Sequence, residues 1–243
     1  MTAKARAIAA PDAEEVPAAS VEEEFRDFSY IVSHDLATSL RHMSEFSRLL
    51  VADLGDGLSE RQRAHADHVR AAAERCQQMT EQLLVFSRVQ QKPLELVRQN
   101  ANPSVQLALL QLAAKVQTAG VEVSVDQLGD AWADPKLLSL AIRHLLDNAI
   151  KFRQPGVTPR IFVRPAHDRL AWRMRISDNG PGVEPAFREK AFRMFQRLHA
   201  DDTLPGVGAG LAITRRIARR HGGEARLVDA AEGACVELSL PHG

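Results

Sequence analysis

Apolar side chains recur every three or four residues from Phe25 to Leu54, which is the spacing of one face of an α-helix. The positions between these ends are Phe28, Val32, Leu36, Leu40, Met43, Phe46 and Leu50. The pattern predicts one continuous amphipathic helix to about Asp53, which would be about 45 Å long at about 1.5 Å per residue. A single small domain cannot cover a helix of that length.

A second long helix is expected after the glycine-containing turn at 54–59. Ser59 precedes it and Gln62 follows three residues later, which is the arrangement of a capping box. Its apolar side continues to about Val89, and Pro93 ends the run. Two antiparallel helices that share one apolar face cannot bury that face alone, so we expect a second copy of the chain to complete a four-helix bundle.

The chain after Pro93 alternates between strand and helix patterns. Strands are expected at 94–99, 121–125, 160–165, 170–177, 224–229 and 234–240, and helices at 103–119, 134–152 and 208–221. The sequence therefore predicts an α+β multidomain protein, in which a long helical hairpin precedes an α/β sandwich. We expect a disordered tail at 1–21, a hairpin domain at 22–92 and the sandwich at 93–243.

The composition narrows the class of protein. The chain has 243 residues, with 31 basic and 31 acidic side chains and a net charge of zero, so nucleic acid is not an expected partner. Cys76 and Cys235 are far apart, which fits neither a disulfide framework nor a structural zinc site. No apolar run approaches the roughly 18 residues of a membrane span, so we expect a cytoplasmic protein without direct membrane insertion.

His34 is the first candidate for chemistry, in the segment SHDLATSLR. At about 100° per residue it points away from the apolar stripe. Asp35 is adjacent, and Thr38 lies four residues further along the same helical face. A carboxylate can hold one ring N–H of an imidazole and leave the other nitrogen as a nucleophile. An exposed histidine on a polar face is common, however, so this segment alone decides nothing.

The segment HLLDNAIKF places His144, Asn148 and Lys151 on one side of a predicted helix, at steps of four and three. An amide oxygen such as that of Asn148 can ligate Mg²⁺, and the Lys151 ammonium can bind phosphate oxygens. A solvated helix face that ends in lysine would produce the same spacing.

Two further segments combine glycines with polar groups. In DNGPGV, Asp178 ends a predicted strand, and glycines at 180 and 182 allow the backbone to approach a flat ligand. A tight turn would explain these glycines equally well. In GVGAGLAI, three glycines precede a helix, so backbone N–H groups and the positive end of the helix dipole face the space in front of it; they are Gly206, Gly208 and Gly210.

The order of these segments resembles that of the sensor histidine kinases of two-component systems, over about residues 22–243. SHDLATSLR is similar to the phosphoacceptor box of the dimerisation and histidine-phosphotransfer domain. HLLDNAIKF, DNGPGV, AFRMFQRLH and GVGAGLAI are similar to the N, G1, F and G2 boxes of the ATP-binding domain. The sequence departs from the usual pattern at Ala37, Ser39 and His144, where a basic residue, proline and asparagine are common.

The resemblance implies a role for each matched residue. His34 would accept the γ-phosphoryl group of ATP, Asp35 would serve as its hydrogen-bonding base, and Thr38 would take part in dephosphorylating the partner. Asn148 would ligate Mg²⁺, and Asp178 would bind the adenine amino group. The remaining matched residues would contact phosphates or frame the pocket and its lid at about 197–207; they are Lys151, Gly180, Gly182, Arg197, Gly206, Gly208 and Gly210.

The resemblance also implies the partners. A homodimeric kinase would autophosphorylate and pass the phosphoryl group to an aspartate of a response-regulator receiver domain in trans, with its input from a separate sensor protein. Three alternatives stay open from the sequence: a dimeric signalling scaffold, a phosphotransferase that borrows its phosphoryl group from another kinase, and a related ATPase without histidine phosphorylation.

Overall fold

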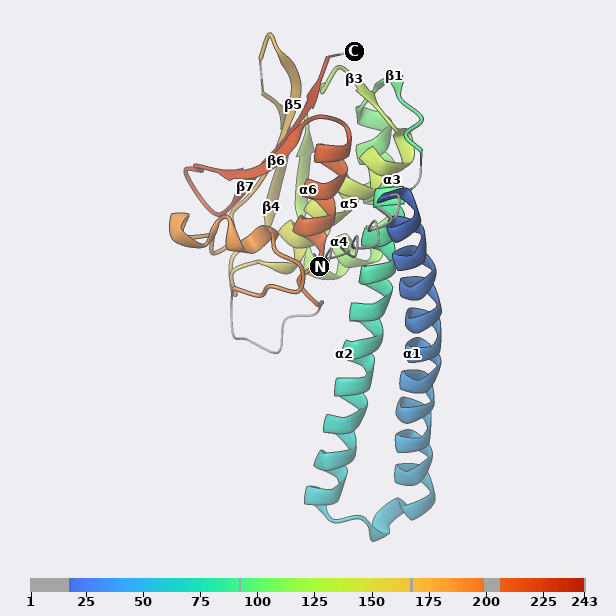
Figure 1. The fold of residues 1–243 in the computed structure, drawn as a ribbon. Coiled ribbons are helices and arrows are strands. Elements are labelled where there is room, and N and C mark those ends of the chain that lie inside the picture. The colour runs from blue at the N-terminus through green and yellow to red at the C-terminus, as the bar shows by residue number, and fades with distance from the viewer. Residues whose placement is uncertain (1–17, 92, 167, 199–205, 243) are drawn as a thin grey trace, which may run out of the picture.

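The computed structural model describes residues 18–91, 93–166, 168–198 and 206–242, with side chains from Leu36 onward except Asp56. The chain begins with two long antiparallel helices, α1 (Ala18–Leu54) and α2 (Glu60–Gln91), joined by a 3₁₀ turn at Gly55–Gly57 (Figure 1). The predicted hairpin is confirmed. α1 starts at Ala18, four residues before the predicted start of the hairpin domain, and residues 1–17 of the expected tail lie outside the described residues.

The predicted capping box starts α2. The backbone N–H of Ser59 donates to Gln62 Oε1 at 2.8 Å, and the Gln62 N–H donates to Ser59 Oγ at 3.3 Å. These reciprocal bonds satisfy donors that the first turn of a helix leaves without partners. Ser47 Oγ donates to the Ala66 carbonyl at 3.2 Å and so fixes which residues of the two helices lie side by side.

A five-stranded sheet forms the centre of the second half of the chain, in the order β2-β4-β5-β7-β6. β2 and β4 are parallel and the other neighbours are antiparallel. The strands are β2 (Glu122–Val125), β4 (Arg160–Pro165), β5 (Ala171–Asp178), β6 (Glu224–Val228) and β7 (Cys235–Pro241). These five strands correspond to the strands that the sequence predicts after residue 120.

Helices cover one face of this sheet and enclose the core between the two layers (Figure 1). They are α3 (Asn102–Gln111), α4 (Ala113–Ala119), α5 (Pro135–Lys151) and α6 (Gly210–Arg220). Leu138, Ile142, Met174, Ile213 and Leu238 are among the buried side chains. The α/β sandwich is therefore confirmed as a layer of helices on a mixed sheet.

The structure differs from the sequence prediction in two local details. The helix expected at 103–119 is interrupted at Leu112, whose ψ angle of 7° is not helical. β3 (Asp130–Ala133) was not predicted, because its two buried side chains are alanines and its one large apolar side chain, Trp132, is 41% exposed. It pairs with β1 (Val97–Asn100) in a separate two-stranded sheet.

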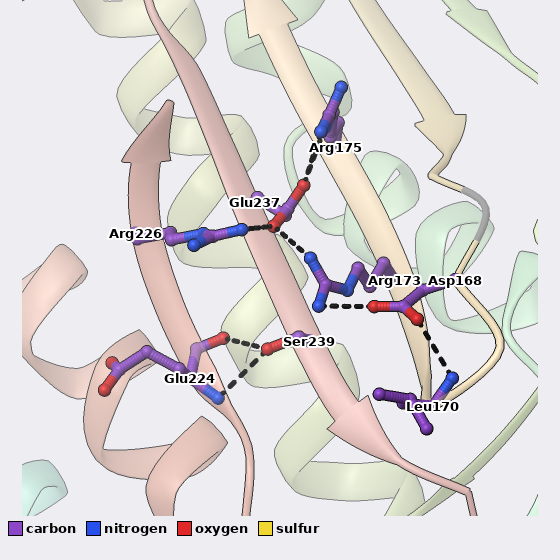
Figure 2. Close-up of polar contacts among 8 residues, drawn as sticks. All are labelled: Asp168, Leu170, Arg173, Arg175, Glu224, Arg226, Glu237 and Ser239. Atoms are coloured by element: carbon purple, nitrogen blue, oxygen red, sulfur yellow. Dashed lines mark hydrogen bonds and ion pairs between the residues drawn. The ribbon is translucent and has the colours of Figure 1, made fainter. Parts of the chain in front are cut away.

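The sheet face away from the helices is held by a glutamate at its centre (Figure 2). Glu237 on β7 is 1% exposed and accepts hydrogen bonds from Arg173, Arg175 and Arg226 at 3.2, 2.8 and 2.7 Å. Burial raises the pKa of Glu237, but the bonds from Arg226 and Arg175 lower that pKa by more, so it lies below its ordinary value. The carboxylate thus ties β5, β7 and β6 together.

Candidate nucleotide site

A cavity of about 350 Å³ opens between α5, the start of α6, the end of β5 and the segment before residue 198. Asp134 fixes the start of α5, because its Oδ1 atom accepts the backbone N–H groups of Lys136 and Leu137 at 2.9 and 3.1 Å. Four turns further on, Asn148 and Lys151 reach the cavity from the same helix. One capped helix therefore positions Asn148 and Lys151, two of the three polar groups that the sequence places on one side of it.

Asp178 lies where β5 ends, and its carboxylate lines the cavity. Its Oδ1 atom accepts the backbone N–H of Gly180 at 2.8 Å and that of Ala234 at 3.1 Å. Burial raises the pKa of Asp178, although these two hydrogen bonds lower it in part. With Oδ1 held by two donors, Oδ2 is left to accept a hydrogen bond from a ligand.

Two of the glycines that line the cavity let backbone segments pack closely beside it. A Cβ atom on Gly208 would lie 2.6 Å from the Gln196 carbonyl oxygen, and one on Gly182 would lie 2.7 Å from that of Gly233. Both glycines have φ near +75°, a conformation that other residues rarely adopt. Gly210 then starts α6 beside the cavity, so the unpaired N–H groups of the first helical turn face it.

The cavity has a basic end. Lys151 and Arg197 both line it, and a Cβ atom on Gly206 would lie 3.3 Å from Lys151 Nζ. The pKa of Lys151 is lowered, first by burial and then by the nearby charge of Arg197. Lys115 from α4 also lines the cavity and forms an ion pair with Asp147. Such an end suits phosphate groups, because several cations converge on it.

His144 is buried in the cavity wall, although its spacing was equally compatible with a solvated helix face. It is 8% exposed, and burial lowers its pKa to about 4, so the imidazole is neutral at neutral pH. Its buried Nε2 atom has no hydrogen-bond partner among the described residues. Its Nδ1 atom and Asn148 Oδ1 both lie within 4 Å of the point where a Gly210 Cβ would be, at 3.4 and 3.7 Å.

Most of the predicted ATP-site residues meet at this cavity. Asn148, Lys151, Asp178, Gly182, Arg197, Gly206, Gly208 and Gly210 line it. Gly180 does not: it is buried behind Asp178, and a Cβ there would lie 2.1 Å from the Phe152 carbonyl oxygen. Gly180 thus allows two backbone segments to pack closely and does not itself contact a ligand in the cavity.

The phosphoacceptor segment lies in α1, and none of its described side chains, which begin at Leu36, lines the cavity. Thr38 is half-buried there, and the side chains of His34 and Asp35 lie outside the described part of the chain, as do residues 199–205 of the expected lid. Sequence reasoning missed Gln78, Gln82 and Lys115, which line the cavity from α2 and α4. It also missed Gly233, where a Cβ would lie 2.0 Å from the Asp178 carbonyl oxygen. No sequence motif marks these four residues.

Two family profiles match the chain. Residues 26–92 match the "His Kinase A (phospho-acceptor) domain", and residues 133–243 match the "Histidine kinase-, DNA gyrase B-, and HSP90-like ATPase". The chain belongs to the sensor histidine kinases. The order of its two domains, a phosphoacceptor hairpin followed by an ATPase fold, is the order in which the structure places the helical hairpin and the cavity-bearing sandwich.

Several characterised proteins are similar to this histidine kinase. Phytochrome-like protein Cph1 of Synechocystis is 30% identical over 221 residues, which cover 90% of this chain and 29% of Cph1. Methanogenesis regulatory histidine kinase FilI of Methanothrix harundinacea is 31% identical over 225 residues, which cover 90% of this chain and 25% of FilI. The kinase chain thus spans less than a third of the length of either relative.

Solved structures share the fold. Full-length ShkA in complex with AMPPNP has a TM-score of 0.62 at 21% identity, covering 90% of this kinase and 47% of ShkA. ThkA in complex with the response regulator protein TrrA has a TM-score of 0.63 at 17% identity, covering 96% of this kinase and 68% of that chain. At these identities the likeness concerns the arrangement of hairpin and sandwich.

The residues of the cavity fit a nucleotide with its cation. The first turn of α6 offers backbone N–H groups, the Nε2 atom of His144 lacks a hydrogen-bond partner among the described residues, and the basic end suits phosphates. Among the described residues, no group of three or more His, Cys, Asp or Glu side chains could hold a metal by itself. A cation bound here would therefore need phosphate oxygens as ligands besides the Asn148 amide oxygen. No helix among the described residues is both long and apolar enough to cross a membrane.

Proposed function

We propose that this histidine kinase uses Mg·ATP to phosphorylate His34 and then passes the phosphoryl group to an aspartate of a response-regulator receiver domain on another protein. In the first step the bond between the γ-phosphorus and its bridging oxygen breaks, a phosphorus–nitrogen bond forms on the imidazole, and ADP is released. Asp35 accepts the hydrogen bond of the other ring N–H and stabilises the charge that the ring gains. In the second step the aspartate oxygen replaces the imidazole nitrogen on phosphorus.

The register of the hairpin is the observation that carries this proposal. The Ser47–Ala66 hydrogen bond places these residues side by side on antiparallel helices. Counting thirteen residues back from Ser47 and thirteen on from Ala66 brings His34 level with Met79, because both helices rise by the same amount per residue. Gln78 and Gln82, on either side of Met79, line the nucleotide cavity. The phosphoacceptor and the cavity are therefore at the same height on the hairpin.

The chain's own residues would bind and orient the nucleotide. Asp178 Oδ2 accepts a hydrogen bond from the adenine amino group. The backbone N–H groups in the first turn of α6 donate hydrogen bonds to phosphate oxygens. Asn148 provides an amide oxygen for the cation, while Lys151 and Arg197 hold the phosphates. ATP supplies the phosphoryl group, and Mg²⁺ offsets its charge. Positioning and charge neutralisation are what phosphoryl transfer requires.

A homodimer would cover the apolar face of the hairpin. Met43, Phe46 and Leu50 on α1 are 52%, 62% and 60% exposed, and Val69 and Leu83 on α2 are 47% and 41% exposed. A second copy can pack the same side chains against them as a four-helix bundle. The phosphoacceptor domain that matches this segment supports such a dimer.

A phosphatase activity toward the partner is the second candidate function. Thr38 follows Asp35 by three residues, which is the spacing that the resemblance assigns to dephosphorylation. A relative of 37% identity over 117 residues is named a signal transduction histidine-protein kinase/phosphatase, MprB of Mycobacterium ulcerans; the match covers 46% of this chain and 22% of that protein. Thr38 would orient the attacking water, so it would be needed for hydrolysis and not for autophosphorylation.

The decisive experiment incubates the chain with ATP labelled on the γ-phosphate and Mg²⁺. Acid-labile, base-stable label is expected on the wild type and on His42→Gln, and none on His34→Gln. His42 is the matched control because it is an exposed histidine on the same helix. Asp178→Asn should lose the label because its nucleotide affinity falls about 100-fold or more. A wild-type chain that binds ATP but takes up no label would contradict the kinase proposal and favour a signalling scaffold.

The phosphatase proposal needs a separate measurement. Thr38→Ala should slow the loss of phosphate from a phosphorylated receiver domain at least tenfold while it autophosphorylates at nearly the wild-type rate. Ser39→Ala, the neighbouring hydroxyl, should change neither rate. Equal loss of both activities in Thr38→Ala would refute the division of labour.

A further inference from the structure

Helix α2 of the hairpin forms one wall of the nucleotide cavity. Gln78 and Gln82 are four residues apart, so they lie on the same face of the helix, and both line the cavity. The other lining residues all come from the sandwich domain. Neither glutamine amide has a hydrogen-bond partner among the described residues. The NH₂ group and the carbonyl oxygen of each side chain are therefore left for a ligand.

Two arginines of α6 hold this wall in place. Arg220 donates to the carbonyl oxygen of Val89, near the end of α2, where helix carbonyls lack partners within the helix. The Arg216 guanidinium lies 5.1 Å from the centre of the Phe86 ring, within the range of a cation–π contact. Val89 is 3% exposed and belongs to the core of the sandwich domain. The last turns of α2 are thus packed onto the domain that carries the cavity.

The glutamines share the cavity with the two lysines of its basic end, Lys115 and Lys151. Lys115 lines the same cavity, and its charge contributes to lowering the pKa of Lys151. The register of the hairpin places Gln78 and Gln82 at the height of His34, to which the phosphoryl group must travel. Amide N–H groups are suitable donors to phosphate oxygens and to the phosphoryl group in transit.

We infer that the nucleotide site is shared between the two domains: Gln78 and Gln82 of α2 bind the phosphate end of the nucleotide, and nucleotide binding and the docking of α2 strengthen each other. This inference rests on the proposed function. Because binding linkage is reciprocal, nucleotide strengthens the docking of α2 by the same factor by which docked α2 strengthens nucleotide binding. A variant that weakens docking should therefore weaken nucleotide binding by up to that factor. Arg216 and Arg220 are positioning residues in this scheme.

The test measures the affinity of the full chain for AMPPNP with Mg²⁺ by calorimetry, in the His34→Gln background so that no phosphoryl transfer intervenes. The Gln78→Ala/Gln82→Ala variant should bind AMPPNP about threefold to tenfold more weakly, because it loses one or two hydrogen bonds to the nucleotide. Gln90→Ala is the matched control, an exposed glutamine on α2 outside the cavity lining, and should bind as the parent does.

A second pair of variants separates binding from folding. Gln78→Glu/Gln82→Glu has nearly the same shape but places negative charge beside phosphate, so it should bind still more weakly than the alanine variant. The Arg216→Ala/Arg220→Ala variant keeps every cavity residue and should also bind more weakly. In the parent, AMPPNP should slow amide hydrogen exchange over residues 78–89 of α2, and this slowing should disappear in the arginine variant.

The outcomes distinguish the inference from the function on which it rests. Unchanged affinity in the alanine and glutamate variants, or no effect of AMPPNP on exchange in α2, would overturn the shared site. If wild-type protein still labels His34 under those results, the kinase function stands and only the inference fails.

Discussion

The hairpin and the sandwich domain bury their apolar residues in opposite ways. Among the described side chains, α1 has no buried residue and α2 has only Ala73 and Val89, whereas Phe46 is 62% exposed. In the sandwich, Ile142 and Ile213 are fully buried. An isolated pair of helices has no second layer against which to pack, whereas a sheet covered by helices encloses its own core. The exposed apolar face of the hairpin therefore needs a partner, whereas the sandwich encloses a core to which only the end of α2 is added.

The largest expected effect is the loss of the dimer that the hairpin forms, with the sandwich left intact. Phe46→Asp would place a charge in the centre of the dimer interface, so the dimer should dissociate at micromolar concentration. Light scattering should report the mass of a monomer, while AMPPNP still binds. Arg61→Asp, a change of two charge units at an exposed position of α2 compared with one unit for Phe46→Asp, should nevertheless remain dimeric. A Phe46→Asp variant that stays dimeric would contradict the bundle.

The next effect, in the sandwich, depends on pH. Because the pKa of His144 falls from its ordinary 6.5 to about 4 on folding, the neutral ring stabilises the fold fully above pH 6.5. This stabilisation is lost as pH falls from 6.5 towards 4, by about 2–3 kcal/mol at pH 4.5. Urea unfolding of His144→Asn and wild type at pH 7 and 4.5 should show the difference. Parallel losses in the two proteins would assign the acid sensitivity elsewhere.

A change on the outer face of the sheet should have a somewhat smaller effect. Glu237→Gln removes the charge that three arginines share and should lower the free energy of unfolding of the sandwich by about 1–3 kcal/mol. Thermal unfolding followed by calorimetry measures it. Glu232→Gln is the control, because Glu232 is 70% exposed and forms one ion pair with Arg160. Equal effects of the two changes would show that the buried position of Glu237 does not increase its contribution to the free energy of unfolding.

The smallest expected effect returns to the hairpin. Ser59→Ala removes the cap of α2 and should cost about 1 kcal/mol of hairpin stability, measured by the midpoint of helix loss in urea. Ser59→Asp can still accept the Gln62 N–H and should restore most of it. An effect of Ser59→Ala on nucleotide affinity would show that the far end of the hairpin is coupled to the cavity.

Periodicity and local motifs predicted the elements well wherever the signal lay within one segment. The spacing from Phe25 to Leu54 predicted α1, Ser59 with Gln62 predicted the start of α2, and Asp134 before Pro135 predicted that of α5. β3 was missed because its buried side chains are small alanines and Trp132 is exposed, so its sequence lacks the apolar alternation of a strand. Local signals thus predict most elements, and pairing with β1 decides an element that has no such signal.

The candidate site shows the same division. Asn148, Lys151, Asp178 and the glycines of the G2 box are recognisable because their spacing along the chain is regular, and the structure brings them to one cavity. The burial of His144 was not predictable from its position on a helix, because it depends on the neighbouring start of α6 at Gly210. Burial in turn decides its protonation state.

The sequence by itself determined the two domains, the family and most residues of the nucleotide site, because each of these is written in short, ordered segments. Only the tertiary structure decided that α2 closes the cavity through Gln78 and Gln82, and that Arg216 and Arg220 hold it there. The two arginine contacts join residues 131 and 130 positions apart, and no local pattern encodes them. Packing between domains selects them, since a helix face acquires its role only from the surface against which it lies.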